Sequence, residues 1–302
     1  MKRVVLTLAC VMLLALLPAG EAGAGWVIDQ VMRSPAGAPG KGGGPDRQIL
    51  TLSANRMKTV MLDQGGKPAA AWVVDLDAQT LISVDYAQRT VTTGTVQEYA
   101  ESIHGATQAM GGQMAEAMKQ MQDAMKDMPP EQRQMVEQMM RRSTPGGGPA
   151  GAAPSAEACR QPKVEVRPTG QTASIAGYAA KRYDVYEDGK FAHELWVSPA
   201  ITAWREIDPG KMQRFGQEMA KAMAALPGCG GQRARSTGAD PNDPAWKLAG
   251  EGYPVRTVEH GPAEGAVVEV VKAESRSVPA SEFQAPADFT RQSFKDMISG
   301  GK

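Results

Sequence analysis

The chain contains many segments in which apolar and polar side chains alternate, and short polar turns separate them. Such alternation is typical of β-strands with one buried face, and short connections join antiparallel neighbours. We therefore expect an α+β fold in which one large, curved antiparallel sheet carries helices on its concave face. The expected strands are residues 25–33, 47–53, 56–62, 68–75, 80–85, 89–93, 163–167, 172–175, 181–186, 191–197, 246–248, 253–259 and 266–275.

Residues 96–142 are predicted to form a helical insertion with an almost purely methionine face. From Met110 onward, methionines recur at steps of four, four, three, four and three residues, which places six of them within about 80° of arc. A glycine pair at 111–112 loosens this helix, and a proline pair at 129–130 ends it and begins a shorter one. The six methionines are Met110, Met114, Met118, Met121, Met125 and Met128.

A second helix with a methionine-bearing face is expected after residue 207. Asp208 and Pro209 have the pattern of an N-cap followed by a first helical residue. The helix that they open places five apolar side chains within about 80° of arc. We expect both groups of methionine-rich amphipathic helices to lie across the concave face of the sheet. The five side chains are Met212, Phe215, Met219, Met223 and Leu226.

The first 24 residues have the form of a cleavable signal peptide. Lys2 and Arg3 precede an apolar core at 4–17, and residues 22–24 have the small-residue A-x-A form that precedes a cleavage site. We expect cleavage before Gly25 and export to the periplasm. The apolar core is too short for a membrane span of about 20 residues, and no second apolar stretch of this kind follows, so a transmembrane protein is not expected.

The charge balance bears on the expected partners of the protein, and the cysteines bear on a candidate disulfide. The 33 basic and 33 acidic residues cancel and form no basic block, so a nucleic-acid partner is not expected. Cys159 and Cys229 are the thiols left after cleavage, and in an oxidising compartment they are candidates for a disulfide, with two free thiols as the alternative. Residues 143–162 are a Gly/Pro/Ala tract that we predict to be flexible.

Several short motifs resemble those of an exported bacterial family of domains of unknown function. They are G-Q-T-A-S-I-A-G-Y at 170–178, Y-D-V-Y-E-D-G at 183–189, L-W-V-S-P at 195–199 and P-P-E-Q-R at 129–133. The strand plan of that family looks like the LolA and LppX lipoprotein-carrier superfamily. The resemblance implies a single LolA-like domain over residues 25–302, an incompletely closed barrel with an apolar cavity under inserted helices, and acyl-chain cargo.

The sequence contains none of four common motifs of enzyme active sites and nucleotide-binding sites. It has no G-x-S-x-G, no H-E-x-x-H, no Walker loop and no G-x-G-x-x-G between a strand and a helix. The histidines are scattered and are expected at the surface, His193 in an exposed or edge position. We therefore expect a protein without catalytic residues, cofactor or metal site. The three histidines are His104, His193 and His260.

Methionine side chains are flexible and polarizable, so a surface made of them adapts to ligands of varying shape. The expected function is reversible binding of an apolar molecule, such as a lipid or acyl chain. One alternative is a protein-interaction or envelope-stress sensing module with an envelope protein as partner, and another is thioether capture of copper. Packing of these methionines in the core is also compatible with the pattern. The candidate lining residues are Met114, Met118, Met121, Met125, Met219 and Met223.

Overall fold

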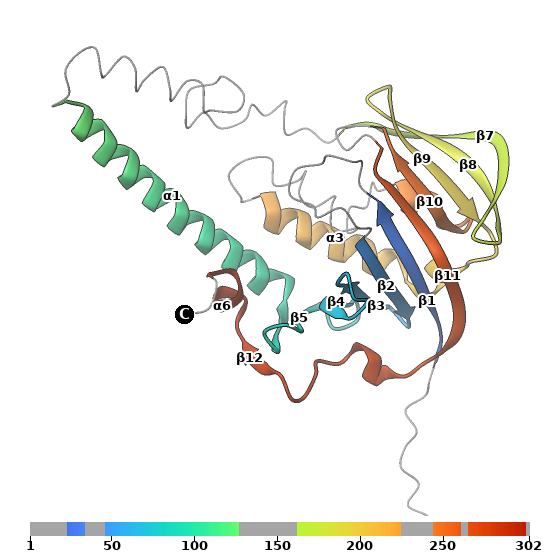
Figure 1. Ribbon diagram of the computed structural model, residues 1–302, viewed down its shortest axis with the longest axis horizontal. Helices are drawn as coiled ribbons and strands as arrows, with labels where there is room; N and C mark the ends of the chain where they lie inside the picture. The colour runs from blue at the N-terminus through green and yellow to red at the C-terminus, as the bar shows by residue number, and fades with distance from the viewer. Residues whose placement is uncertain (1–22, 34–45, 127–161, 225–243, 261–264, 300–302) are drawn as a thin grey trace, which may run out of the picture.

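The computed structural model describes residues 23–33, 46–126, 162–224, 244–260 and 265–299, and a twelve-stranded sheet forms its centre (Figure 1). The strand order is β12-β6-β5-β4-β3-β2-β1-β11-β10-β9-β8-β7. All neighbours are antiparallel except β12, which runs parallel to β6. The predicted large, curved antiparallel sheet is confirmed, and it is open because its end strands do not pair. The strands are β1 (Gly23–Arg33), β2 (Asp46–Ser53), β3 (Arg56–Leu62), β4 (Pro68–Asp75), β5 (Thr80–Asp85), β6 (Thr90–Thr95), β7 (Val164–Ile175), β8 (Tyr178–Glu187), β9 (Lys190–Ser198), β10 (Tyr253–Glu259), β11 (Val267–Val278) and β12 (Thr290–Gln292).

Helices lie beside the sheet, and the last of them follows the final strand in the chain. The helix predicted from residue 96 begins there and continues through the glycine pair at 111–112, because glycine is tolerated within a helix at a cost of about 1 kcal/mol. None of the described helices combines the length and the hydropathy that a membrane crossing requires. The helices are α1 (Val96–Lys126), η1 (Ala203–Glu206), α3 (Pro209–Ala224), α5 (Pro244–Lys247), η3 (Ala280–Phe283) and α6 (Phe294–Ser299).

Two local predictions differ from the structure. Residues 246–248 were expected to be a strand, but they follow Pro244 into the short helix α5 and the turn after it, since proline suits the first helical position. The strands expected at 163–167 and 172–175 are one strand, β7, whose register shifts between Pro168 and Thr172. The shorter helix expected after the proline pair at 129–130, most of the tract at 143–162 and both candidate disulfide cysteines lie outside the described residues.

Helix α3 packs against a core to which both halves of the sheet contribute. Its Met212, Phe215 and Met219 are each at most 5% exposed. They share one buried cluster with Leu81 of β5 and Ile175 of β7, strands that are far apart in the sheet order. A helix can join such distant strands only from the inside of a curved sheet, so α3 lies on the concave side. Full burial of each large apolar side chain stabilises the fold by about 1.5–3 kcal/mol.

The register of the first five strands identifies the side chains that share the concave face with α3. Leu52 of β2 lies opposite Met57 of β3, which lies opposite Val74 of β4, which lies opposite Leu81 of β5. All four belong to or pack against the buried cluster that contains α3. Because side chains alternate between the two faces of a strand, the residues two positions away lie on the same face.

The opposite face of the sheet is covered by the C-terminal segment. Phe283 of η3 is buried in a cluster with Val73 of β4, and Phe289 packs against a cluster that contains Ala71 of β4. The segment ends with β12 on the edge of β6 and with α6, which contacts α1 and β6. Strand β4 is therefore covered on both faces, by α3 and α1 on one side and by the end of the chain on the other.

Asn55, in the turn between β2 and β3, holds the N-terminus of α3 in place. Its side-chain oxygen accepts a hydrogen bond from the backbone amide of Asp208 at 2.8 Å, and its amide donates to the carboxylate of Asp77 at 3.4 Å. The Asn55 backbone amide donates to the carbonyl oxygen of Glu206, and its carbonyl accepts from Leu76. Asp208 in turn caps α3 by accepting from the amide of residue 211, as the sequence predicted.

Replacing Asn55 is expected to destabilise the protein through two separable effects. Asn55 has a φ of 62°, a left-handed conformation that asparagine and glycine tolerate. Asn55→Gly keeps this conformation and removes the side-chain hydrogen bonds, so we expect a loss of about 1–2 kcal/mol in the free energy of unfolding. Asn55→Ala adds the strain of alanine at positive φ, about 1 kcal/mol more. Denaturant unfolding of both variants measures these effects, and a glycine variant as stable as wild type would contradict them.

Candidate functional site

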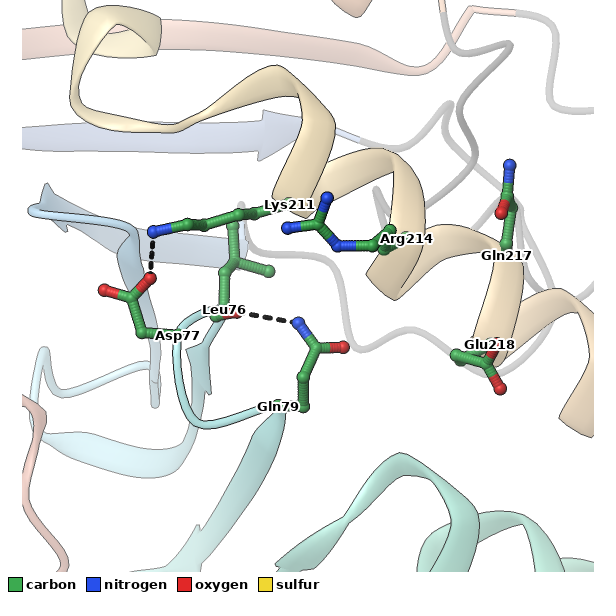
Figure 2. A pocket seen from close by; sticks show the side chains of 7 residues that line it. All are labelled: Leu76, Asp77, Gln79, Lys211, Arg214, Gln217 and Glu218. Carbon is green, nitrogen blue, oxygen red and sulfur yellow. Dashed lines mark hydrogen bonds and ion pairs between the residues drawn. The ribbon is translucent and has the colours of Figure 1, made fainter.

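A polar pocket lies between α3 and the turn that joins β4 to β5 (Figure 2). Its volume is about 660 Å³, within the range of about 300–1,000 Å³ that is usual for small-ligand sites. Leu76, which is 1% exposed and belongs to the core cluster, forms the apolar part of the wall. The turn contributes Leu76, Asp77 and Gln79, and α3 contributes Lys211, Arg214, Gln217 and Glu218.

Ion pairs and hydrogen bonds join the two walls of this pocket. Lys211 forms an ion pair with Asp77 across it, and the hydrogen bond from Lys211 is the main cause that holds the pKa of Asp77 below its ordinary value. Gln79 donates its side-chain amide to the carbonyl oxygen of Leu76 at 2.7 Å, as Figure 2 shows. On α3, Glu218 pairs with Lys221 at 2.7 Å. The pocket is therefore framed by neutralised pairs.

A second surface feature is a strip of apolar side chains on the concave face of the central strands. We define the apolar strip as Leu50 of β2, Met57 and Met61 of β3, and Trp72 of β4. Leu50 and Trp72 both lie opposite Thr59, and Met57 and Met61 point to the same face two positions on either side of it. Met61 is 39% exposed and the other three are half-buried, so this part of the face is not closed over.

Helix α1 borders the apolar strip at one end. Trp72 contacts Tyr99 of α1 edge-on, with ring centroids 6.0 Å apart, and Tyr99 contacts Phe294 of α6 in the same manner at 5.2 Å. Burial raises the pKa of the Tyr99 hydroxyl. The main contacts of α1 are with α3, α6 and β6, and in Figure 1 the helix extends away from the sheet beyond them.

Polar side chains border the strip on the side of β1. Gln48 donates to Gln30 at 2.8 Å, and Gln30 donates to the hydroxyl of Tyr253 at 2.8 Å. Burial is the main cause that raises the pKa of Tyr253. Because these three side chains bond to one another, the polar groups next to the strip are satisfied within the protein itself.

The predicted lining methionines are described only in part. Met219 is buried in the main core beside Phe215 and is 5% exposed. Met223 lies in α3, and the other four lie in α1, but the side chains of these five are outside the described part of the structure. Their role as ligand lining therefore stays a prediction. The four in α1 are Met114, Met118, Met121 and Met125.

Among the described residues, no group of three or more histidine, cysteine, aspartate or glutamate side chains is arranged to hold a metal ion. The copper alternative depends on methionine sulfur atoms of α1, whose positions are not described, so it stays a prediction as well.

A family model described as a domain of unknown function, DUF4412, matches residues 107–289, which is more than half of the chain. The chain belongs to the DUF4412 family. The matched region includes the C-terminal half of the sheet, which carries the sequence motifs at residues 170–199.

Solved structures similar to this DUF4412 chain include an uncharacterized conserved protein from Thermus thermophilus, with 9% identity, a TM-score of 0.41 and coverage of 90% of this chain and 91% of the other. The MucA/MucB complex of Pseudomonas aeruginosa has 8% identity, a TM-score of 0.34 and coverage of 89% of this chain, which spans 58% of that chain. PNGF-II has 11% identity and a TM-score of 0.34, and this chain spans 33% of its length. No curated protein matches. Similarity at these levels transfers neither a partner nor an activity.

One titratable site of this DUF4412 chain was missed from the sequence. His193 of β9 was expected to be exposed or at an edge, but it lies between β8 and β10 with its side chain 22% exposed. Its Nδ1 is 2.8 Å from the carboxylate of Glu259 and its Nε2 is 3.5 Å from that of Glu187. Burial opposes the charged form, but the two carboxylates outweigh it and raise the pKa of His193.

His193 is expected to make the stability of the protein depend on pH. Since its pKa is raised by folding, its protonated form stabilises the fold fully below the ordinary value of about 6.5, and this contribution disappears as the pH rises through the raised pKa. The difference in unfolding free energy between wild type and His193→Gln should therefore shrink from about pH 6 upward. Denaturant unfolding across this range measures it. His260→Gln is the control, because that ring stacks on Phe191, and a difference that grows with pH would contradict the assignment.

Proposed function

We propose that this protein is an exported, non-enzymatic binding protein that holds an apolar ligand, such as an acyl chain, against the concave face of its sheet. The apolar strip is the observation that supports this proposal. It places half-exposed apolar side chains next to the core under α3, on the same face of the sheet. An apolar ligand laid on this strip would remove both its own surface and that of the strip from water.

The size of the expected gain fits reversible binding. Each methylene group removed from water contributes about 0.8 kcal/mol, so an acyl segment of eight such groups contributes roughly 6 kcal/mol before the costs of association. Met57 and Met61 add flexible, polarizable contacts that adapt to chains of different length. Four half-buried tryptophans also pack on the main core, which makes the protein's own fluorescence a reporter for a ligand there. They are Trp26, Trp196, Trp204 and Trp246.

Helix α1 is the element that would cover such a ligand. It meets the strip where Tyr99 contacts Trp72, and the side chains described from residue 108 onward are exposed. Four of the six methionines predicted to line the ligand belong to this part of α1, and the glycine pair at 111–112 is the candidate hinge. The proposal therefore assigns the sheet as the floor of the site and α1 as its adjustable cover.

Replacing Met61 by glutamine is expected to weaken binding of a fatty acid brominated at mid-chain. The wild-type protein should bind this probe with quenching of tryptophan fluorescence. Met61→Gln removes about 1 kcal/mol of apolar contact, which corresponds to a roughly fivefold higher Kd. The matched control is Val271→Gln on β11, because Val271 is the other large apolar side chain among the described residues that is exposed, at 48% compared with 39% for Met61. Equal effects of the two changes, or no saturable quenching in wild type, would contradict the proposal.

Export makes a separate prediction about the N-terminus. The protein recovered from the periplasm should have the intact mass of a chain that begins at Gly25. In the full chain β1 starts at Gly23, and the carbonyl oxygen of Ala24 accepts a hydrogen bond from Ser53 at 3.2 Å. Cleavage at the expected site therefore removes two paired residues from the end of β1. A mass that retains residues 1–24, or protein found only in the cytoplasm, would count against export.

A partner-docking module and a methionine-rich copper protein remain alternative functions. Both depend on the exposed part of α1, and the acyl-chain assay separates them from the carrier because neither predicts a loss of fatty-acid binding in Met61→Gln.

A further inference from the structure

The pocket beside α3 contains one basic side chain that has no acidic partner among the described residues. Asp77 is neutralised by Lys211 and Glu218 by Lys221. Within the part of the chain that the structure describes, Arg214 makes neither a hydrogen bond nor an ion pair, although its guanidinium group offers five donors. Among the described residues, Arg214 is therefore the charged side chain of the pocket that no opposite charge pairs with.

Arg214 lacks a partner among the described residues because its charged neighbours on α3 are bound elsewhere. Glu218 follows it by four residues on α3, a spacing at which the two side chains can meet, but the Glu218 carboxylate is bound to Lys221 instead. Lys211, one turn before Arg214, is bound to Asp77 on the opposite wall. In Figure 2 the guanidinium group of Arg214 lies alongside α3 and points toward the side chain of Lys211, and Gln79 lies on the facing turn.

The remaining polar groups of the pocket are amides with unused hydrogen-bonding capacity. Gln79 uses its NH₂ group to bind the carbonyl oxygen of Leu76, which leaves its side-chain oxygen as an acceptor. Gln217 has no hydrogen-bond partner among the described residues. An arginine beside free amide donors and acceptors matches a carboxylate that is flanked by peptide groups, because arginine binds carboxylates through two parallel hydrogen bonds.

We propose that this pocket is a binding site for a short acidic peptide segment, with Arg214 pairing with a glutamate or aspartate side chain and Gln79 and Gln217 bonding to its backbone. The site is separate from the apolar strip, and the proposal does not depend on acyl-chain binding. The frame of the pocket is fixed before the peptide arrives, because Asn55 and the Lys211–Asp77 pair hold its two walls together. A preformed site loses less free energy to ordering when it binds.

The charges around Arg214 favour a carboxylate over a phosphate group. The single positive charge of the Arg214 guanidinium group matches the single negative charge of a carboxylate. The carboxylates of Asp77 and Glu218 line the same pocket and repel a second negative charge, even though each has a lysine partner. Phosphate carries between one and two negative charges at neutral pH, so it should bind more weakly.

The test is isothermal titration calorimetry of the full chain with two terminally blocked alanine pentapeptides, one with a central glutamate and one with a central glutamine. The glutamate peptide should bind with one site per chain, and the glutamine peptide at least about tenfold more weakly. Arg214→Gln should raise the Kd of the glutamate peptide by a similar factor. Arg205→Gln, which removes an exposed positive charge of η1 outside the pocket, should leave its Kd within about twofold of wild type.

A further variant is expected to change the peptide affinity in the opposite direction. Glu218→Gln removes a competing carboxylate from the pocket and should lower the Kd of the glutamate peptide by roughly threefold. Thermal unfolding shows whether each variant is folded, and all these side chains are exposed enough to be replaced without loss of the fold. Equal binding of both peptides, unchanged binding to Arg214→Gln, absence of saturable binding, or tighter binding of inorganic phosphate than of the peptide would each overturn the proposal.

Discussion

The hydrogen bond from the backbone amide of Asp208 to the side chain of Asn55 ties the start of α3 to the turn between β2 and β3. Both the core under the sheet and the polar pocket depend on it. The inner side of α3 fills the concavity of the sheet with Met212, Phe215 and Met219, and its outer side forms one wall of the polar pocket. Burial supplies most of the stabilising free energy, but apolar contacts have little directional preference. The polar contacts of Asn55 therefore decide the position along the sheet that the helix adopts.

Strand β1 makes it possible for α3 to pack against both series of strands. It lies between β2 and β11 and so joins the N-terminal and C-terminal series of antiparallel strands into one surface. The approach is tight at Gly25, where an added Cβ would lie 2.7 Å from the carbonyl oxygen of Leu52. Since the two series curve toward each other across β1, residues as distant as Leu81 and Ile175 reach the same core.

The strands and the start of each long helix were predictable from sequence because their signals are local. Alternation and short turns indicate antiparallel neighbours, and Asp208 and Pro209 mark a helix start wherever that helix packs. The pocket was not predictable, since Asp77 and Lys211 meet only after α3 has packed on the sheet. His193 was misjudged for the same reason: its two carboxylates come from neighbouring strands. A segment of three residues, 246–248, is too short for its periodicity to separate a strand from a helical turn.

The two long helices are held to the sheet with very different strength. Three large side chains of α3 are fully buried, and its first turn is tied down by Asn55 and Asp77. Beyond Val96, no described side chain of α1 is fully buried, and Tyr99 and Ile103 are only partly covered. Segments with few buried apolar contacts open at a lower free-energy cost than segments with many. Any change that exposes or covers the apolar strip is therefore expected to move α1, while α3 and the pocket on its outer side keep their positions.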